Sequence, residues 1–186
     1  NGAMDSGELP PLPVEWGGSV RYVGGFVHTS EDLVPFARYN ISHPAWYGGA
    51  KQLCWSNGSL IKFLTDAVRS LLANNPAAEG EQAIVSVSQN DVGGSGPSCA
   101  GYPNGRCYCT TPEEQRIIQL EGSPMGPMLR AVNKIAVAVA EDYPRVAIET
   151  LAYDYTMHPP RLTRPRPNVL VTFCTMSSSS YGTTFM

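Results

Sequence analysis

The sequence predicts an α/β fold built from parallel βα units, and three observations lead to this expectation. Short segments rich in β-branched residues alternate with two long segments whose apolar residues recur at three- and four-residue spacing. The loops that follow the strand segments are long and polar, whereas those that precede them are short. Strands that alternate with helices of more than about ten residues are typical of a parallel sheet.

The first strand is expected over Val20–Val27, although its glycines weaken it, and His28 follows at its end. Ser30 is a suitable cap for a short helix that begins at Glu31, because its hydroxyl can accept a hydrogen bond from the free N–H groups of the first turn. The acidic residues at the start of this helix favour the same assignment, since they oppose the positive end of the helix dipole.

Aromatic residues and glycines over 40–58 indicate a loop before the first long helix. Asn57 or Ser59 can cap this helix, and Asn74-Asn75-Pro76 stops it. The pattern that predicts the helix consists of Leu60, Ile61, Leu64, Ala67, Val68, Leu71 and Leu72.

The second strand is expected over Ala83–Asn90, and it ends at Asp91 before a glycine-rich break at 93–97. A loop that carries cysteines follows. The second long helix ends at Tyr143-Pro144, and it is predicted by Met125, Met128, Leu129, Val132, Ile135, Ala136, Val139 and Ala140.

The last two strands are expected over Val146–Tyr153 and Asn168–Cys174. In barrels and open α/β sheets alike, ligands bind at the carboxyl ends of the strands. The long polar loops of this chain lie on that side, which places the expected site around Asn90-Asp91. The domain is expected over 19–176, with an extended Pro/Gly-rich segment over 1–18 and a polar Ser-rich tail over 177–186.

The composition excludes some classes of protein. With 42% hydrophobic and 16% charged residues in 186, wholesale disorder is not expected. The net charge of −3 and the absence of a Lys/Arg run argue against nucleic acid as a partner. Prolines interrupt the basic stretch of Arg161, Arg164 and Arg166, which is expected to be a solvated loop. No segment has the roughly 20 apolar residues of a membrane span, and the start at Asn1 suggests a processed product or a fragment.

The five cysteines favour an oxidising setting. A disulfide from Cys99 to Cys107 or Cys109 is expected, and the odd number leaves at least one thiol free or paired outside the chain. Asn40 and Asn57 begin N-glycosylation sequons. Together these features predict an extracellular, secreted protein.

Asp91 is the candidate catalytic residue, because a carboxylate at a strand end beside apolar walls can act as a general acid. The alternative is that it caps the turn that follows. If the valines of this strand face the helices, alternation points the Asn90 side chain towards the opposite, interior face of the sheet. The Asp91 side chain would reach that face only if the strand bends at its end. Asp154 is a candidate for a second carboxylate, whereas Glu149 is expected to be a paired core residue or a residue of the bottom face.

His28 and Tyr153, each at the end of a strand, are candidates to bind sugar hydroxyls, although Tyr153 can equally be a packing residue. Trp55 could stack on a sugar face or cap the apolar rim. Nothing in the sequence pairs histidines or cysteines as metal ligands, and no phosphate loop or nucleophile elbow is present. Neither a metal nor a cofactor is therefore expected.

Four segments in order resemble a glycoside-hydrolase-like family called domain of unknown function 4838. They are His43–Tyr47 with Gln52–Trp55, then Ser86–Asp91, then Val132–Ala136 ahead of Tyr143-Pro144, and finally Thr150–Tyr153 with Pro159-Pro160 and Pro167–Val169. The resemblance covers about residues 25–176. It implies a (β/α)₈ TIM-type barrel related to hexosaminidases and α-glucuronidases, of which four strands are about half.

One departure from the family pattern concerns the cysteines. The family often follows its Asn-Asp with Cys-x-Cys-x-x-Cys, but here Cys107-Tyr108-Cys109 is followed by Pro112, and Cys99 lies in an inserted loop. A metal role shared with the family is therefore in doubt.

Two functions remain open. The first is a carbohydrate-active or carbohydrate-binding domain of the glycoside hydrolase type, with a glycan or glycoprotein as its partner. Hydrolysis needs two carboxylates, or one carboxylate and a substrate acetamido group. The second is a non-catalytic module of an extracellular assembly, whose partners would be the remaining barrel segments or another extracellular chain.

Overall fold

A computed structural model of the chain describes residues 20–78, 81–91 and 99–174. It contains a four-stranded sheet in the order β1-β2-β3-β4, with all neighbouring pairs parallel. The strands are β1 (Val20–Tyr22), β2 (Gln82–Ser86), β3 (Val146–Ala152) and β4 (Val169–Phe173). The predicted fold of parallel βα units is confirmed, and the open sheet is compatible with part of a barrel.

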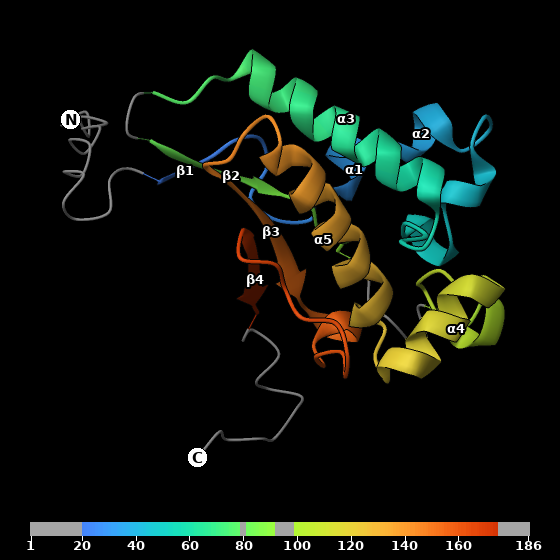
Figure 1. Cartoon of the computed structure of the whole chain (residues 1–186). Coiled ribbons are helices and arrows are strands. Elements are labelled where there is room, and N and C mark those ends of the chain that lie inside the picture. Colours follow the sequence, from blue (N-terminus) through green and yellow to red (C-terminus); the bar gives the residue numbers. More distant parts are fainter. Residues whose placement is uncertain (1–19, 79–80, 92–98, 175–186) are drawn as a thin grey trace, which may run out of the picture.

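Two long helices, α3 (Gly58–Asn74) and α5 (Met125–Ala140), lie side by side on one face of the sheet (Figure 1). Shorter helices are α1 (Ser30–Leu33), α2 (Phe36–Tyr39) and α4 (Pro112–Glu121). Single 3₁₀ turns form η2 (Pro44–Trp46), η3 (Gly49–Lys51), η5 (Pro103–Gly105) and η6 (Asp154–Thr156).

The core lies between the sheet and these two helices. Val85 and Val87 face it, together with helix residues such as Leu64 and Ile135, all of them at most 1% exposed. Ser86 and Ser88 face the other way, where their hydroxyls lie 3.2 Å apart. The alternation predicted for this part of the chain is therefore confirmed.

Some bounds and caps differ from the sequence prediction. The strand β2 ends at Ser86 rather than Asn90. The strand β1 ends at Tyr22 rather than Val27, because the chain turns at Gly24, whose φ of +83° suits glycine. Ser30 does not cap α1; its hydroxyl instead donates to the carbonyl of Ser88. Of the two predicted caps of α3, Asn57 is confirmed, because its Oδ1 accepts from two backbone N–H groups.

The helix α4 was not predicted, although its end signals are present in the sequence. Thr111 accepts a hydrogen bond from the N–H of Glu114, and Pro112 occupies the first turn. Gly122 ends the helix in the left-handed conformation at φ +69°. These end signals alone did not predict the helix, because only one of its faces is buried and its apolar residues show little helical periodicity.

Two disulfides join the loops on the helix side. Cys99 pairs with Cys107, which confirms one of the two predicted alternatives, whereas the alternative with Cys109 is wrong, because Cys109 pairs with Cys54. Cys174 is free. Two disulfides are typical of an oxidising compartment.

The extended segment expected over 1–18 and the tail expected over 177–186 lie outside the described residues. Within the described ranges, none of the helices has the length and apolar character that crossing a membrane requires.

Candidate functional site

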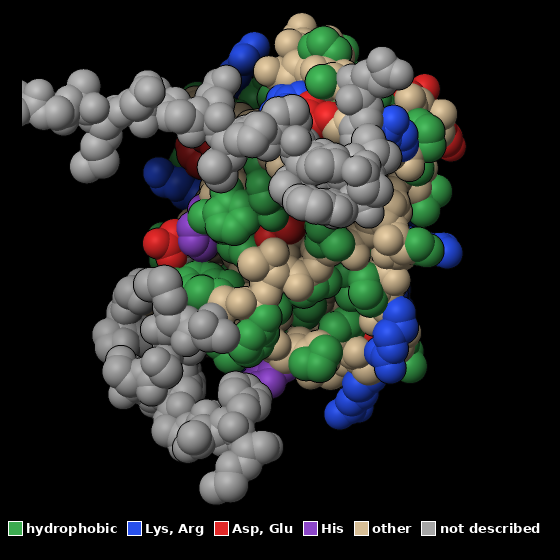
Figure 2. Space-filling model, turned by 90° about the vertical axis from the view of Figure 1, so that its left-hand side faces the viewer, with side chains coloured by type: hydrophobic (Ala, Val, Ile, Leu, Met, Phe, Trp, Pro, Cys, Tyr) green, Lys and Arg blue, Asp and Glu red, His purple; other side chains and the backbone are tan. Residues whose placement is uncertain are grey.

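The carboxyl ends of β1, β2 and β3 lead into a shared cavity of about 450 Å³. The segments that reach it leave the sheet at different strands, which is the usual construction of a site in a parallel sheet. The cavity is lined by Phe26, Val27, His28, Asp91, Leu151, Tyr153, Thr172 and Cys174. Three predicted site residues, His28, Asp91 and Tyr153, are thus brought together. Figure 2 shows the face seen from the left of Figure 1, where apolar side chains gather with a few charged ones among and beside them.

Asp91 is at the centre of this group. The hydroxyl of Tyr153 donates to Asp91 Oδ1 over 3.0 Å, and His28 Nε2 lies 3.9 Å from the same oxygen. The Asp91 side chain is 67% exposed, so its carboxylate can meet a ligand from solvent. The side chain reaches the cavity because Asp91 lies five residues beyond the end of β2 at Ser86, outside the regular strand.

Tyr153 is a hydrogen-bond donor at neutral pH. Its bond to the Asp91 carboxylate, together with burial, raises the pKa of Tyr153 to about 12, because loss of the phenol proton would place two negative charges side by side. The residue follows β3 directly and opens η6.

His28 is held in one orientation. Its Nδ1 lies 3.0 Å from the carbonyl oxygen of Gln89, and since a carbonyl only accepts, Nδ1 carries the proton. The other nitrogen, Nε2, then faces Asp91. His28 has a φ of +57°, a conformation that costs a non-glycine residue about 1 kcal/mol and is concentrated at functional sites.

The unusual backbone of His28 has a local cause. The chain must turn directly after it so that Thr29 and Ser30 can reach β2, where Thr29 Oγ1 donates to the carbonyl of Ser86 over 2.8 Å. The N–H of Ser30 donates to the carbonyl of Ser88 over 3.1 Å. These bonds fix His28 against the segment that carries Asp91.

Asn90 is not among the residues that line the cavity. Its Nδ2 donates to the carbonyl of Lys51 over 3.1 Å, and its backbone exchanges two hydrogen bonds with the amide of Gln52. Gln52 is fully buried. Asn90 therefore anchors the segment on which Asp91 lies, and its contact with a substrate stays a prediction.

Two residues that sequence reasoning missed position the same segment. Besides Gln52, the fully buried Gln89 donates from Nε2 to Thr156 Oγ1 over 2.7 Å and to the carbonyl of Tyr153 over 3.1 Å. The end of β2 is thereby tied to the end of β3. A signal existed, because a glutamine inside or beside an apolar run has to find hydrogen-bond partners once it is buried.

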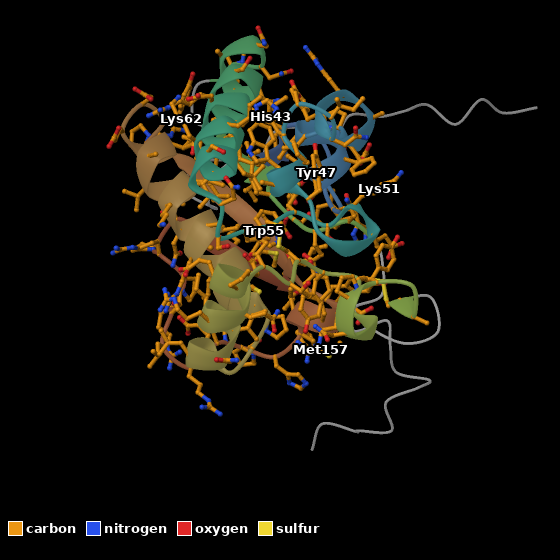
Figure 3. All side chains as sticks on the ribbon, turned by 90° about the vertical axis from the view of Figure 1, so that its right-hand side faces the viewer. His43, Tyr47, Lys51, Trp55, Lys62 and Met157 are labelled. Carbon is orange, nitrogen blue, oxygen red and sulfur yellow. A yellow bond between two sulfur atoms is a disulfide. The ribbon has the colours of Figure 1, made fainter. Side chains whose placement is uncertain are left out.

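Asp154 and Trp55 do not join the group. Asp154 is exposed, has a φ of +50° and is not among the residues that line the cavity. Trp55 is 3% exposed and lies in the core, near the middle of the molecule in Figure 3. This burial favours the packing role for Trp55, and stacking on a sugar stays a prediction.

Glu149 lies on the interior face of β3, opposite Ser86 in the register of the sheet. It is fully buried, and burial raises its pKa, which the nearby hydroxyls of Ser86 and Thr172 offset only in part. Neither carboxylate oxygen makes a well-aligned hydrogen bond with a described residue. The expectation of a buried residue is confirmed, but the expectation that it is paired is wrong.

The structure gives no support to a metal site among the described residues, where no three His, Cys, Asp or Glu side chains are grouped suitably. Cys107 and Cys109, which match part of the family's cysteine motif, are both oxidised in disulfides. They therefore offer no thiolate to a metal ion.

Comparison with known proteins identifies the family. Residues 14–184 match the model of the family described as Domain of unknown function (DUF4838), and the chain belongs to this family. No curated protein and no solved structure matches the chain.

Proposed function

With this family membership as the premise, we propose that the domain binds carbohydrate at the strand-end cavity around Asn90-Asp91, as a glycoside-hydrolase-like module of a secreted protein. The observation that carries the proposal is the convergence of Asp91, Tyr153 and His28, from three different strands, on one cavity. The two disulfides support the extracellular setting.

The chemistry of the cavity suits a sugar. Asp91 accepts hydrogen bonds, Tyr153 donates one, and His28 presents Nε2. The side chains of Phe26 and Leu151 supply apolar wall for the C–H faces of a pyranose ring. The cavity volume of about 450 Å³ lies within the range of roughly 300–1,000 Å³ that small-molecule sites occupy.

Catalysis would require more than binding. Glycoside hydrolysis uses two carboxylates, or one carboxylate that orients a substrate acetamido group. Asp91 is the one carboxylate among the described residues that line the cavity. The acetamido group can replace only the nucleophile, and a separate acid must still protonate the leaving group. The site therefore fits recognition of an acetamido sugar, in which Asp91, held by Tyr153, accepts the N–H. The substrate class proposed is accordingly glycans that carry N-acetylhexosamine.

The test uses Asp91→Asn, which keeps the shape of the side chain and removes its charge. Binding to an array of glycans is expected to weaken by about tenfold or more, because a hydrogen bond to a charged group contributes roughly 1.5–3 kcal/mol. Turnover of nitrophenyl N-acetylhexosaminides, if the wild-type protein shows it, is expected to fall with binding. The matched control is Asp66→Asn, an exposed carboxylate on α3.

Unchanged glycan binding in folded Asp91→Asn would contradict the proposal. Binding restricted to glycans without N-acetylhexosamine would contradict the proposed substrate class but not the proposal that the cavity binds carbohydrate. Circular dichroism and thermal unfolding of both variants establish that they are folded.

A second candidate function rests on a different observation. Large apolar residues are exposed on the two outermost strands: Val20 on β1, and Leu170, Val171 and Phe173 on β4. Unpaired sheet edges with apolar side chains favour association. A non-catalytic module that completes its sheet with further barrel segments or another extracellular chain fits this pattern. Light scattering that shows a monomer at all concentrations would contradict this second function. If the glycan array also showed no binding, both functions would be ruled out.

A further inference from the structure

The connection between β3 and β4 has an unusual construction. Parallel strands are commonly joined through an α-helix, but residues 157–168 form an extended loop without one. The loop carries Arg161, Arg164 and Arg166, and all three are exposed. In Figure 1 it runs beside α5 at the lower end of the molecule.

The first anchor of this loop is Glu121, a fully buried residue at the end of α4. Its carboxylate accepts hydrogen bonds from the N–H of Leu162 over 3.0 Å, from the N–H of Thr163 over 3.1 Å, and from the hydroxyl of Thr163. Burial alone raises the pKa of Glu121, but these bonds and the one from Arg130 lower it to about 2. The anchor is therefore charged and fully paired at neutral pH.

The second anchor is Asn133 on α5. Its Nδ2 donates to the carbonyl of Arg164 over 2.8 Å, and its Oδ1 accepts from the N–H of Arg166 over 2.9 Å. The arginine backbones are thus fixed along the helix, which explains why a polar residue occupies this otherwise apolar stretch. Since the loop is held in advance, a ligand would not have to order it.

Unpaired positive charges gather beside the loop. Arg166 lines a groove of about 650 Å³ together with Lys134 of α5 and the arginines at 116 and 130. Among the described residues, no carboxylate lies within ion-pair distance of Arg161, Arg164, Arg166 or Lys134. We call these four residues the basic surface. Its positive charge contrasts with the chain as a whole, whose net charge is −3.

Two carboxylates among the described residues, Glu113 and Glu141, also line the groove, and both are engaged. Glu113 forms a bidentate pair with Arg116, and Glu141 lies 3.5 Å from Arg69. Glu121 is saturated by its own donors. Arg164 Nη1 donates to the carbonyls of Pro160 and Arg161, which leaves its charge unneutralised. A ligand that neutralised the four cations would have to supply several negative charges in a row.

We propose that the basic surface binds a sulfated linear polysaccharide. Such a chain presents anionic groups at intervals along its length, which suits cations spread over an extended loop and the neighbouring helix. The disulfides point to an oxidising compartment, where acidic polysaccharides are accessible and nucleic acids are not the usual partner. This inference does not rest on the strand-end cavity, whose residues it does not use.

The attraction depends on several charges acting together. A single exposed ion pair contributes little because water and salt screen it. A polyanion that meets several cations at once releases its bound counterions, and the affinity then falls steeply as salt rises. Strong dependence on ionic strength is therefore part of the proposal.

The experiment measures the affinity of the full chain for heparin by titration calorimetry over a series of salt concentrations. The test variant combines Lys134→Gln, Arg161→Gln and Arg166→Gln. The control combines Arg38→Gln, Lys51→Gln and Lys62→Gln, which remove the same charge from exposed positions on other elements. Figure 3 labels Lys51 and Lys62, on η3 and α3.

The test variant is expected to bind heparin roughly 10- to 100-fold more weakly, because it removes three of the four cations that a polyanion would meet at once. The control variant is expected to keep the wild-type affinity within about twofold, because screened charges far from the ligand add little. If the triple variant does not fold, Lys134→Gln with Arg166→Gln replaces it, since neither of these side chains makes a hydrogen bond or ion pair with a described residue.

Equal losses in the test and control variants would overturn the proposal, because they would show a response to net charge alone. So would equal affinity for heparin and for chemically desulfated heparin, or an absence of heparin binding by the wild-type chain. Tighter binding to vesicles of anionic phospholipid, or to DNA, than to heparin would reject a polysaccharide as the partner.

Discussion

Glu121 and Glu149 are both fully buried carboxylates, yet they lie in opposite surroundings. Glu121, on the helix side, accepts hydrogen bonds from Arg130, Leu162 and Thr163, and its pKa is lowered to about 2. Glu149, on the interior face of the sheet, makes no well-aligned hydrogen bond with a described residue, and its pKa is raised. The comparison teaches that the buried carboxylate on the helix side is satisfied by its neighbours, whereas the one on the interior face of the sheet lacks a well-aligned partner among the described residues.

Removal of the disulfide between Cys54 and Cys109 is expected to have the largest effect on stability. Replacing Cys54 with Ala is expected to lower the free energy of unfolding by about 4 kcal/mol, because the bond closes a long loop in the unfolded chain; the cysteines are 55 residues apart. Chemical denaturation gives the value. Replacement of the free Cys174 by Ala is the control, and a similar loss there would contradict this account.

Glu121→Gln is expected to destabilise the protein by about 3 kcal/mol at neutral pH, because it removes the charge that Arg130 and the loop require. The pH dependence has a definite sign. Since the folded pKa is depressed, the stabilisation is complete above the unfolded pKa, near 4.3, and is lost as pH falls towards 2. The free energy of unfolding, measured by denaturation at each pH between pH 2 and pH 7, should therefore depend less on pH in the variant than in the wild type. An equal dependence on pH in both proteins would contradict this role of Glu121.

Glu149→Gln is expected to have the opposite sign and a smaller size, a stabilisation of about 1 kcal/mol at neutral pH. The folded pKa is raised, so this residue opposes folding increasingly as pH rises above the unfolded value. The same denaturation experiments apply. A clear destabilisation at neutral pH would mean that Glu149 has a partner that the described residues do not supply, and the contrast with Glu121 would fail.

Tyr153→Phe is expected to have the smallest effect, because it removes one hydroxyl from the rim of the cavity and leaves the ring in place. Glycan affinity should fall by roughly threefold to tenfold, the worth of a single hydrogen bond. Tyr102→Phe, at a 39% exposed tyrosine outside the cavity, is the matched control. A larger change in stability than in glycan binding would assign Tyr153 to packing.

Local chemistry explains which parts of the fold were predictable. The helix α5 was predicted over its full extent because its apolar residues repeat at helical spacing from Met125 to Ala140. The strand β1 was overestimated, since its apolar pattern continues past the point where Gly24 turns the chain. The helix α4 was missed because its evidence lies in its caps, which are weaker signals than periodicity.

The candidate site was predictable in its location and less so in its composition. His28, Asp91 and Tyr153 each follow a strand, and parallel strands bring their carboxyl ends together. Asn90 and Trp55 are also close to strand ends or loops in the sequence, but the fold turns one towards Lys51 and buries the other. No local pattern distinguishes these outcomes.

The sequence by itself determined the parallel βα order, the strand ends that hold the site, and the presence of oxidisable cysteines, because these depend on periodicity and composition along the chain. The tertiary structure alone decided the pairing of Cys54 with Cys109, the isolation of Glu149 and the anchoring of the arginine loop by Glu121 and Asn133. Each of these involves residues that are distant in sequence, and only the packed sheet and helices set which of them meet.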